Sequence, residues 1–169
     1  QFNIVCLGTN NNFSVDYTGT NCSFTWYHGG EVASYVQNYQ LTNAVVGDAG
    51  LYYCRVKNAC GSVLSDNVEI NVFGSPTITT QPHTTSVCEG GSVEFCVEAE
   101  GQYLNYLWKK NGENLLAEQA SCLQLANLSY PHSDVYSVYV YNTCGDITSN
   151  NVHATVNTVP TITGHPVDQ

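Results

Sequence analysis

The chain has 169 residues, with four Lys and Arg against fourteen Asp and Glu, and a formal net charge of −10. So acidic a chain repels polyanions, which argues against nucleic acid and anionic membrane surfaces as partners. No apolar run approaches the roughly 20 residues of a membrane span, so we expect no membrane insertion. Eight cysteines in a chain with only 11% charged residues favour a secreted, extracellular or cell-surface protein held by disulfides.

An internal repeat organises the chain into two copies of one unit. The second copies lie 82 residues after the first ones in the early part of the unit and 84 residues after them in the late part. We therefore predict a first domain at residues 1–74, a second domain at 75–157 and a C-terminal extension at 158–169. The recurring anchors are Val5–Gly8 with Val87–Gly90, Trp26 with Trp108, and Asn58–Gly61 with Asn142–Gly145.

The segments between these anchors alternate apolar and polar residues, as in Phe13–Tyr17 and Val93–Ala99. A period of two is typical of strands that bury one face. Gly29-Gly30 and Asn111-Gly112 supply tight turns after the two tryptophan segments. Because no segment shows a helical period, many short strands with regular turns predict an all-β fold built from β-sandwiches.

The segment Asp48–Cys54, which reads DAGLYYC, resembles the E–F corner and F strand of immunoglobulin-like domains. In that resemblance Tyr52 is the corner tyrosine, two residues before the F-strand cysteine. The strings PTITTQP, VCEGGSVEF, YLWKKNG and NTCG are similar, more specifically, to the Ig-like repeats of secreted and surface proteins of Bacteroidetes. The resemblance implies two tandem Ig-like β-sandwiches, and it is specific for fold but not for function.

The cysteines depart from the family pattern. The usual B-strand cysteine position holds Val15 and Val97, and the F-strand position holds Val138 in the second copy. Since bonded cysteines should occur and be absent together, we predict the pairs Cys6–Cys60, Cys88–Cys144, Cys22–Cys54 and Cys96–Cys122. Scrambled or partly free cysteines are the alternative, because eight cysteines allow many connectivities.

The second domain begins with Pro76–Pro82, which would be its A strand, and this motif recurs at Pro160–Pro166. The first copy contains no such segment. We hypothesise that the recurring segment is a donor strand for the first domain of another copy, lying between Phe13–Gly19 and Asn67–Val72. An unpaired sheet edge favours such strand addition, and repetition would be head to tail. The donor residues would be Pro160, Thr161, Ile162, Thr163, Gly164, His165 and Pro166.

The recurrence of this segment can also arise in two ways that involve no strand donation. The sequence can be an arbitrary cut through a longer tandem array, or the C-terminal segment can fold back onto its own first domain. The prolines at both ends of the segment limit its pairing to a short span, which counts against strand donation.

No catalytic or metal-binding constellation is evident in the sequence. His132, Ser133 and Asp134 are adjacent, and adjacent residues on a turn cannot form a nucleophile–base relay. The five histidines lack metal-ligand spacing. Glu94, Glu98 and Glu100 share one strand face, where a solvated surface is the simpler interpretation than weak Ca²⁺ binding. We therefore expect no enzyme, no cofactor and no metal.

Two surface features complete the sequence prediction. Asn12, Asn21 and Asn127 lie in Asn-x-Ser sequons and are candidate glycosylation sites. Several tyrosines could form an aromatic contact surface, although cross-strand packing is their commoner role on sheets. These tyrosines are Tyr27, Tyr35, Tyr39, Tyr103, Tyr106, Tyr139 and Tyr141.

The function expected from these observations is structural: a subunit of a surface filament or pilus assembled by head-to-tail donor-strand exchange, with other copies of the chain as partners. The alternative is a two-domain part of a long cell-surface adhesin that binds a glycan or protein ligand. A third hypothesis is a spacer or carbohydrate-binding module of a secreted enzyme.

Overall fold

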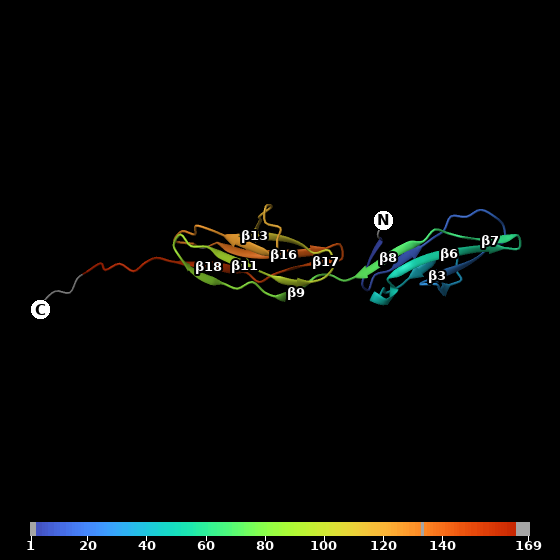
Figure 1. Ribbon diagram of the computed structural model, residues 1–169, viewed down its shortest axis with the longest axis horizontal. Helices are drawn as coiled ribbons and strands as arrows, with labels where there is room; N and C mark the ends of the chain where they lie inside the picture. The colour runs from blue at the N-terminus through green and yellow to red at the C-terminus, as the bar shows by residue number, and fades with distance from the viewer. Residues whose placement is uncertain (1–2, 133, 165–169) are drawn as a thin grey trace. The chain divides into compact units, whose positions relative to one another are not determined.

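The computed structural model describes residues 3–132 and 134–164. The chain divides into two compact units (Figure 1). The first comprises Gln1–Ser75 with Thr143–Gly145, and the second comprises Pro76–Asn142 with Asp146–Gln169. Both are built from strands, and one short 3-10 turn, η1 (Val46–Asp48), is the only helical element in the described part of the chain. The predicted all-β fold of two Ig-like sandwiches is confirmed.

In the first unit, the central strand is β6 (Gly50–Asn58), which pairs antiparallel with β3 (Ser23–His28) on one side and β8 (Val68–Phe73) on the other. β1 (Asn3–Cys6) lies parallel to β8 at one edge of this sheet. The remaining strands of the sheet are β4 (Glu31–Ser34) beside β3 and β7 (Gly61–Leu64) beside β6. A small second sheet pairs β2 (Asn11–Phe13) with β5 (Tyr39–Leu41).

The second unit repeats this plan. Its larger sheet has the order β10 (Thr85–Cys88), β18 (Val152–Asn157), β16 (Val135–Asn142), β13 (Asn105–Lys110) and β14 (Glu113–Asn114), with β17 (Gly145–Thr148) beside β16. β11 (Val93–Cys96) pairs with β15 (Cys122–Leu125). One pair has no counterpart among the described strands of the first unit: β9 (Thr77–Thr80) on β12 (Glu98–Glu100).

Each unit packs its own core around the tryptophan of its central sheet. Trp108 is fully buried, and its indole N–H donates to the carbonyl of Ala120 at 3.0 Å. Trp26 makes the equivalent bond to the carbonyl of Gln37 at 3.2 Å. The alternating residues of β6 and β16 supply the inward side chains that pack against these rings. The period-two pattern of the sequence therefore marks the buried face correctly at Val93, Phe95 and Val97, whereas Val15 is half-buried and Tyr17 is exposed.

Tyr52 has the role that the resemblance implies. Its hydroxyl donates to the carbonyl of Asp48 at 2.9 Å, four residues upstream, and its ring stacks on Phe13 with centroids 4.6 Å apart. Burial raises the pKa of Tyr52 to about 12, with Tyr39 and Asp48 adding to the effect. This hydrogen bond ties the start of β6 to the turn η1, which is the tyrosine corner of Ig-like sandwiches.

Replacing this tyrosine tests the corner. Tyr52→Phe removes one buried hydrogen bond, so the unfolding free energy of the first unit at pH 7 should fall by about 1 kcal/mol. The measurement is urea unfolding followed by tryptophan fluorescence. Because the folded pKa lies above the ordinary value of 10.0, the stabilisation by the neutral phenol is complete below pH 10 and is lost as pH rises through about 12.

The difference in unfolding free energy between wild type and Tyr52→Phe should therefore be smaller at pH 11 than at pH 7. Tyr53→Phe is the matched control, since the neighbouring ring is only half-buried and stacks on Tyr27 at 4.9 Å. A difference that stays the same at pH 7 and pH 11 contradicts the assigned role.

Candidate functional site

A hollow of about 780 Å³ opens in the first unit beside β2 and the residues that follow it. We call this cavity the first-unit hollow. Its lining includes the core residues Trp26 and Tyr52 and the polar residues Ser65 and Asp66. The residues that it shares with the predicted acceptor groove are Phe13, Ser14, Val15, Asp16, Val68 and Ile70.

In the second unit, a strand covers the residues equivalent to Val15 and Tyr17, and a smaller hollow of about 570 Å³ remains beside β10 and β11. There β9 pairs with β12, with Ile78 opposite Ala99, and Ile78 packs against the core. Val97, beside this strand, is 3% exposed. The strand β9, which holds the position of an A strand, therefore covers the second core beside β12.

The first unit leaves this place open. Val15, the counterpart of Val97, is only half-buried, and Tyr17, the counterpart of Ala99, is 40% exposed. Residues 16–18, the counterparts of β12, pair with no described strand. The edge of the first unit is thus available for an added strand next to the first-unit hollow.

The predicted donor segment lies exposed. Figure 1 shows the chain after β18 without a strand, and residues 158–164 have no assigned secondary structure beyond a bend at Gly164. Ile162, the counterpart of Ile78, is 76% exposed. The predicted donor residues His165 and Pro166 lie outside the described residues. In the described part, the donor segment therefore packs on neither core.

The disulfides differ from most of the predicted pairs. Cys96 and Cys122 are bonded as predicted, directly opposite each other on β11 and β15. The second disulfide joins Cys6 to Cys144, with Cα atoms 5.4 Å apart, so the predicted pairs Cys6–Cys60 and Cys88–Cys144 are wrong. The remaining four cysteines are free thiols: Cys22, Cys54, Cys60 and Cys88.

Strand direction explains why Cys6 cannot reach Cys60. Cys6 lies opposite Phe73 at the end of β8, and β8 passes Gly50 at the beginning of β6. Cys60 follows the opposite end of β6, eight residues further along the strand. At ~3.3 Å a residue these ends are roughly 26 Å apart, far beyond the ~7 Å limit for Cα atoms of a disulfide. The same topology separates Cys88 from Cys144 in their repeat.

Register excludes the predicted Cys22–Cys54 bond as well. Cys54 lies opposite Trp26, whereas Ser23 lies opposite Lys57, so Cys22 is four positions from Cys54 along the sheet. That offset is roughly 13 Å, which no disulfide spans. Cys54 is fully buried, and burial raises the pKa of its thiol, which makes it an unreactive core residue.

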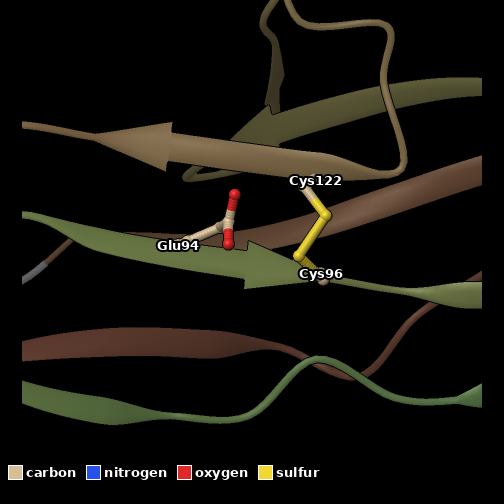
Figure 2. Close-up of side chains that lie close together, drawn as sticks. All are labelled: Glu94, Cys96 and Cys122. Atoms are coloured by element: carbon tan, nitrogen blue, oxygen red, sulfur yellow. A yellow bond between two sulfur atoms is a disulfide. The ribbon is translucent and has the colours of Figure 1, made fainter.

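Glu94, Cys96 and Cys122 place three potential metal ligands within 4.8 Å of one another (Figure 2). Both sulfurs are consumed by the disulfide, and the thiolate is the form of cysteine that binds metals. The Glu94 carboxylate also accepts a hydrogen bond from the Gln124 amide at 2.9 Å. The cluster is therefore a disulfide between two paired strands, beside a glutamate that is hydrogen-bonded to a neutral amide.

Asp134 acts as a structural clamp at the corner before β16. Its carboxylate pairs with Lys110 at 2.8 Å and accepts from the Asn111 amide at 2.7 Å, while the Asn111 oxygen accepts from the Val135 N–H at 2.8 Å. The hydrogen bonds from Lys110 and then Asn111 lower the pKa of Asp134. His132 Nδ1 is 3.9 Å away, and Ser133 lies outside the described residues. These contacts join the turn after β13 to this corner.

Most of the candidate surface tyrosines have packing partners. Tyr39 and Tyr106 pack against the two cores, which removes them from any contact surface. Arg55 lies over the ring of Tyr27 at 5.6 Å, and the second unit exchanges the two positions, with Lys109 over Tyr139 at 5.2 Å. Tyr141 stacks on Tyr139 at 5.2 Å. The most exposed are Tyr35 and Tyr103, at 74% and 64%.

The three sequon asparagines, Asn12, Asn21 and Asn127, are all exposed. Asn21 and Asn127 have positive φ angles of 52° and 54°, a conformation that asparagine tolerates better than most residues. Accessible positions are compatible with a glycan, and glycosylation stays a prediction.

Residues 1–72 match the family model described as "Immunoglobulin domain". Mouse hemicentin-1 is 29% identical over 160 residues, which cover 84% of this chain and 3% of that protein. Human peroxidasin homolog is 39% identical over 69 residues, which cover 39% of this chain and 4% of that protein. The chain thus spans a small part of these relatives.

Solved structures show the same fold. The titin I-band fragment I67–I69 matches with a TM-score of 0.67 at 18% identity, over 92% of this chain and 62% of that one. Fold and comparisons together define a chain of tandem immunoglobulin-like domains. The two relatives are mammalian, so they do not support the narrower resemblance to Bacteroidetes repeats. No described helix is long and apolar enough to cross a membrane.

The Asp134 clamp gives a pH-dependent prediction. Because the folded pKa of Asp134 is lowered, its stabilisation is present above the ordinary value of 3.8 and is lost as pH falls through the folded pKa. Asp134→Asn should therefore lower the unfolding free energy of the second unit by about 1 kcal/mol at pH 7. At pH 2.5 the loss should be smaller, as measured by urea unfolding. Glu113→Gln, at an exposed position of β14, is the control and should change neither value.

Proposed function

We propose that this chain is an extracellular adhesive or structural protein whose copies join head to tail by strand addition. The segment from Pro160 to Gly164 of one copy completes the first unit of the next copy. The observation that carries this proposal is the first-unit hollow beside the uncovered Val15, set against the covered Val97 of the second unit.

The donor segment has the side-chain pattern of the strand it would imitate. In β9 the apolar Ile78 packs inward and is flanked by exposed Thr77 and Thr79. The corresponding donor residues are Ile162 between Thr161 and Thr163. Transferring the β9–β12 register places Ile162 opposite Tyr17 and beside Val15. Covering an exposed isoleucine in this way contributes about 1.5–3 kcal/mol, in addition to backbone hydrogen bonds.

Charge sets the conditions under which this assembly forms. Residues 158–164 carry no charged side chain, so the donor segment itself is not repelled by the hollow. The rest of the chain has a formal net charge of −10, and copies of it repel one another. Salt screens this repulsion, so assembly should be stronger at 150 mM than at 10 mM salt.

An A-type strand from a segment preceding Gln1 in a longer protein would fill the same hollow. In that case the chain is part of a longer adhesin with a glycan or protein ligand, for which Tyr35 and Tyr103 offer exposed rings. Both versions use the same edge, and they differ in whether isolated copies associate. The secreted location and the narrower bacterial resemblance stay predictions under either version.

The test compares Ile162→Asp with Thr163→Asp in the full chain. The first change places a charge where the donor strand must be buried, whereas the second places it on the outward face, as the exposed Thr79 indicates. Sedimentation velocity over a concentration series, supported by negative-stain electron microscopy, should show concentration-dependent linear oligomers for wild type and Thr163→Asp. Ile162→Asp should remain monomeric.

A synthetic peptide with the sequence of residues 158–166 gives a second readout. In excess it should occupy the first-unit hollow and shorten the oligomers of wild type. Strand addition is wrong if wild type stays monomeric at every concentration, or if Ile162→Asp assembles as well as Thr163→Asp.

A further inference from the structure

We infer that Cys60 and Cys88 are the two halves of one further disulfide, formed between Cys88 of one copy and Cys60 of the next. This inference rests on the proposed head-to-tail order and adds a covalent bond to each junction of the assembly. Both side chains are exposed free thiols in the described structure.

The internal repeat identifies the two partners. Cys88 is the counterpart of Cys6, 82 residues later, and Cys60 is the counterpart of Cys144, 84 residues earlier. Cys6 and Cys144 are bonded to each other. Each repeat therefore has one cysteine like Cys6 and one cysteine like Cys144. The observed bond joins the Cys6-like cysteine of one repeat to the Cys144-like cysteine of the repeat that follows. Cys88, which is Cys6-like, and Cys60, which is Cys144-like, remain unbonded.

Cys6 and Cys88 have the same local structure. Each ends the edge strand that runs parallel to the last strand of its sheet, with Cys6 opposite Phe73 and Cys88 opposite Asn157. The next residue donates its N–H to the carbonyl of that opposite residue in both cases. The carbonyl of each cysteine also accepts from an N–H three residues later. These bonds are Leu7 to Phe73 at 3.0 Å, Glu89 to Asn157 at 2.9 Å, Thr9 to Cys6 at 3.0 Å and Gly91 to Cys88 at 2.9 Å.

Cys60 and Cys144 are also held alike. Each lies in the turn between two paired strands, β6 with β7 or β16 with β17. Asn58 precedes Cys60, and its side chain donates to the carbonyl of Thr20 at 3.4 Å. Asn142 precedes Cys144 and donates to the carbonyl of Gln102 at 3.1 Å. Since Thr20 and Gln102 are themselves counterparts, the same hydrogen bond holds the residue two positions before the cysteine in both turns.

Strand addition supplies the missing partner with the same spacing. Pro160 follows Pro76 by 84 residues, so a copy that receives this segment as its A strand takes the place of a next repeat. Its Cys60 then stands to Cys88 of the donor copy as Cys144 stands to Cys6 in one chain. The bond that forms repeats a linkage already present in the structure.

The chemistry is thiol–disulfide exchange with a small-molecule disulfide such as oxidised glutathione. The thiolate of one cysteine attacks a sulfur of the oxidant and releases one thiol, and the second cysteine then displaces the other. Two protein thiols lose two electrons and two protons, one protein disulfide forms, and the oxidant becomes two thiols. Extracellular and secretory compartments maintain such oxidising conditions.

The experiment treats the full chain with oxidised glutathione and separates it on a non-reducing gel after unfolding. Wild type should give a ladder of covalent multimers, with a Cys60–Cys88 peptide identified by mass spectrometry. Cys60→Ser alone and Cys88→Ser alone should each stay monomeric on the gel. An equal mixture of the two variants should give covalent dimers and no larger multimers. One bond can form, between Cys88 of the Cys60→Ser variant and Cys60 of the Cys88→Ser variant.

Cys22→Ser is the matched control, because it removes another free thiol that has no role in the proposed bond and should leave the ladder intact. Covalent dimers from Cys60→Ser or Cys88→Ser alone would show unspecific pairing of exposed thiols and overturn the inference. Linear oligomers by sedimentation without a covalent ladder overturn this bond and leave strand addition standing. If the experiment shows no oligomers and no covalent ladder, both proposals are wrong.

Discussion

The pairing of the central strand with its two antiparallel neighbours is the constraint on which the rest of each unit depends. In the first unit the register of β6 with β3 and β8 fixes Trp26 opposite Cys54 and sets Cys6 and Cys60 at opposite ends of the sheet. Because one residue advances a strand by ~3.3 Å, no side-chain adjustment can compensate for an offset of several residues. This register therefore excludes the bonds Cys6–Cys60 and Cys22–Cys54.

The sequence predicted the features that depend on residues close to one another in one turn or one strand pair. The tryptophan anchors, the corner hydrogen bond of Tyr52 and the Cys96–Cys122 bridge each depend on residues of one strand pair or one turn. The other cysteine pairs depend on which ends of strands meet, and alternation of apolar residues carries no such information. The observation that Cys6 and Cys60 recur together as Cys88 and Cys144 was sound, but a bond within one repeat and a bond between successive repeats produce the same recurrence.

The open edge was visible in the sequence as a missing counterpart, but its physical consequence was not. Only the structure shows that Val15 is half-buried where Val97 is covered, and that the uncovered place forms a hollow reaching Trp26 and Tyr52. The first core nevertheless excludes solvent, since Ile70 and Tyr52 are each 1% exposed. A stable core with one uncovered edge is the arrangement that strand addition requires, because the acceptor must fold before its partner arrives.

In the proposed assembly, strand addition and disulfide formation have different roles. A short donor segment bounded by Pro160 buries one isoleucine and forms few hydrogen bonds, so on its own it gives a reversible junction. A disulfide needs Cα atoms ~4.4–6.8 Å apart, a condition that free copies in solution meet only in passing. Once the strand is seated, the two cysteines of a junction are held at the high effective concentration of a tethered pair. In the proposed assembly the reversible strand addition therefore selects the partner, and the disulfide makes the junction permanent.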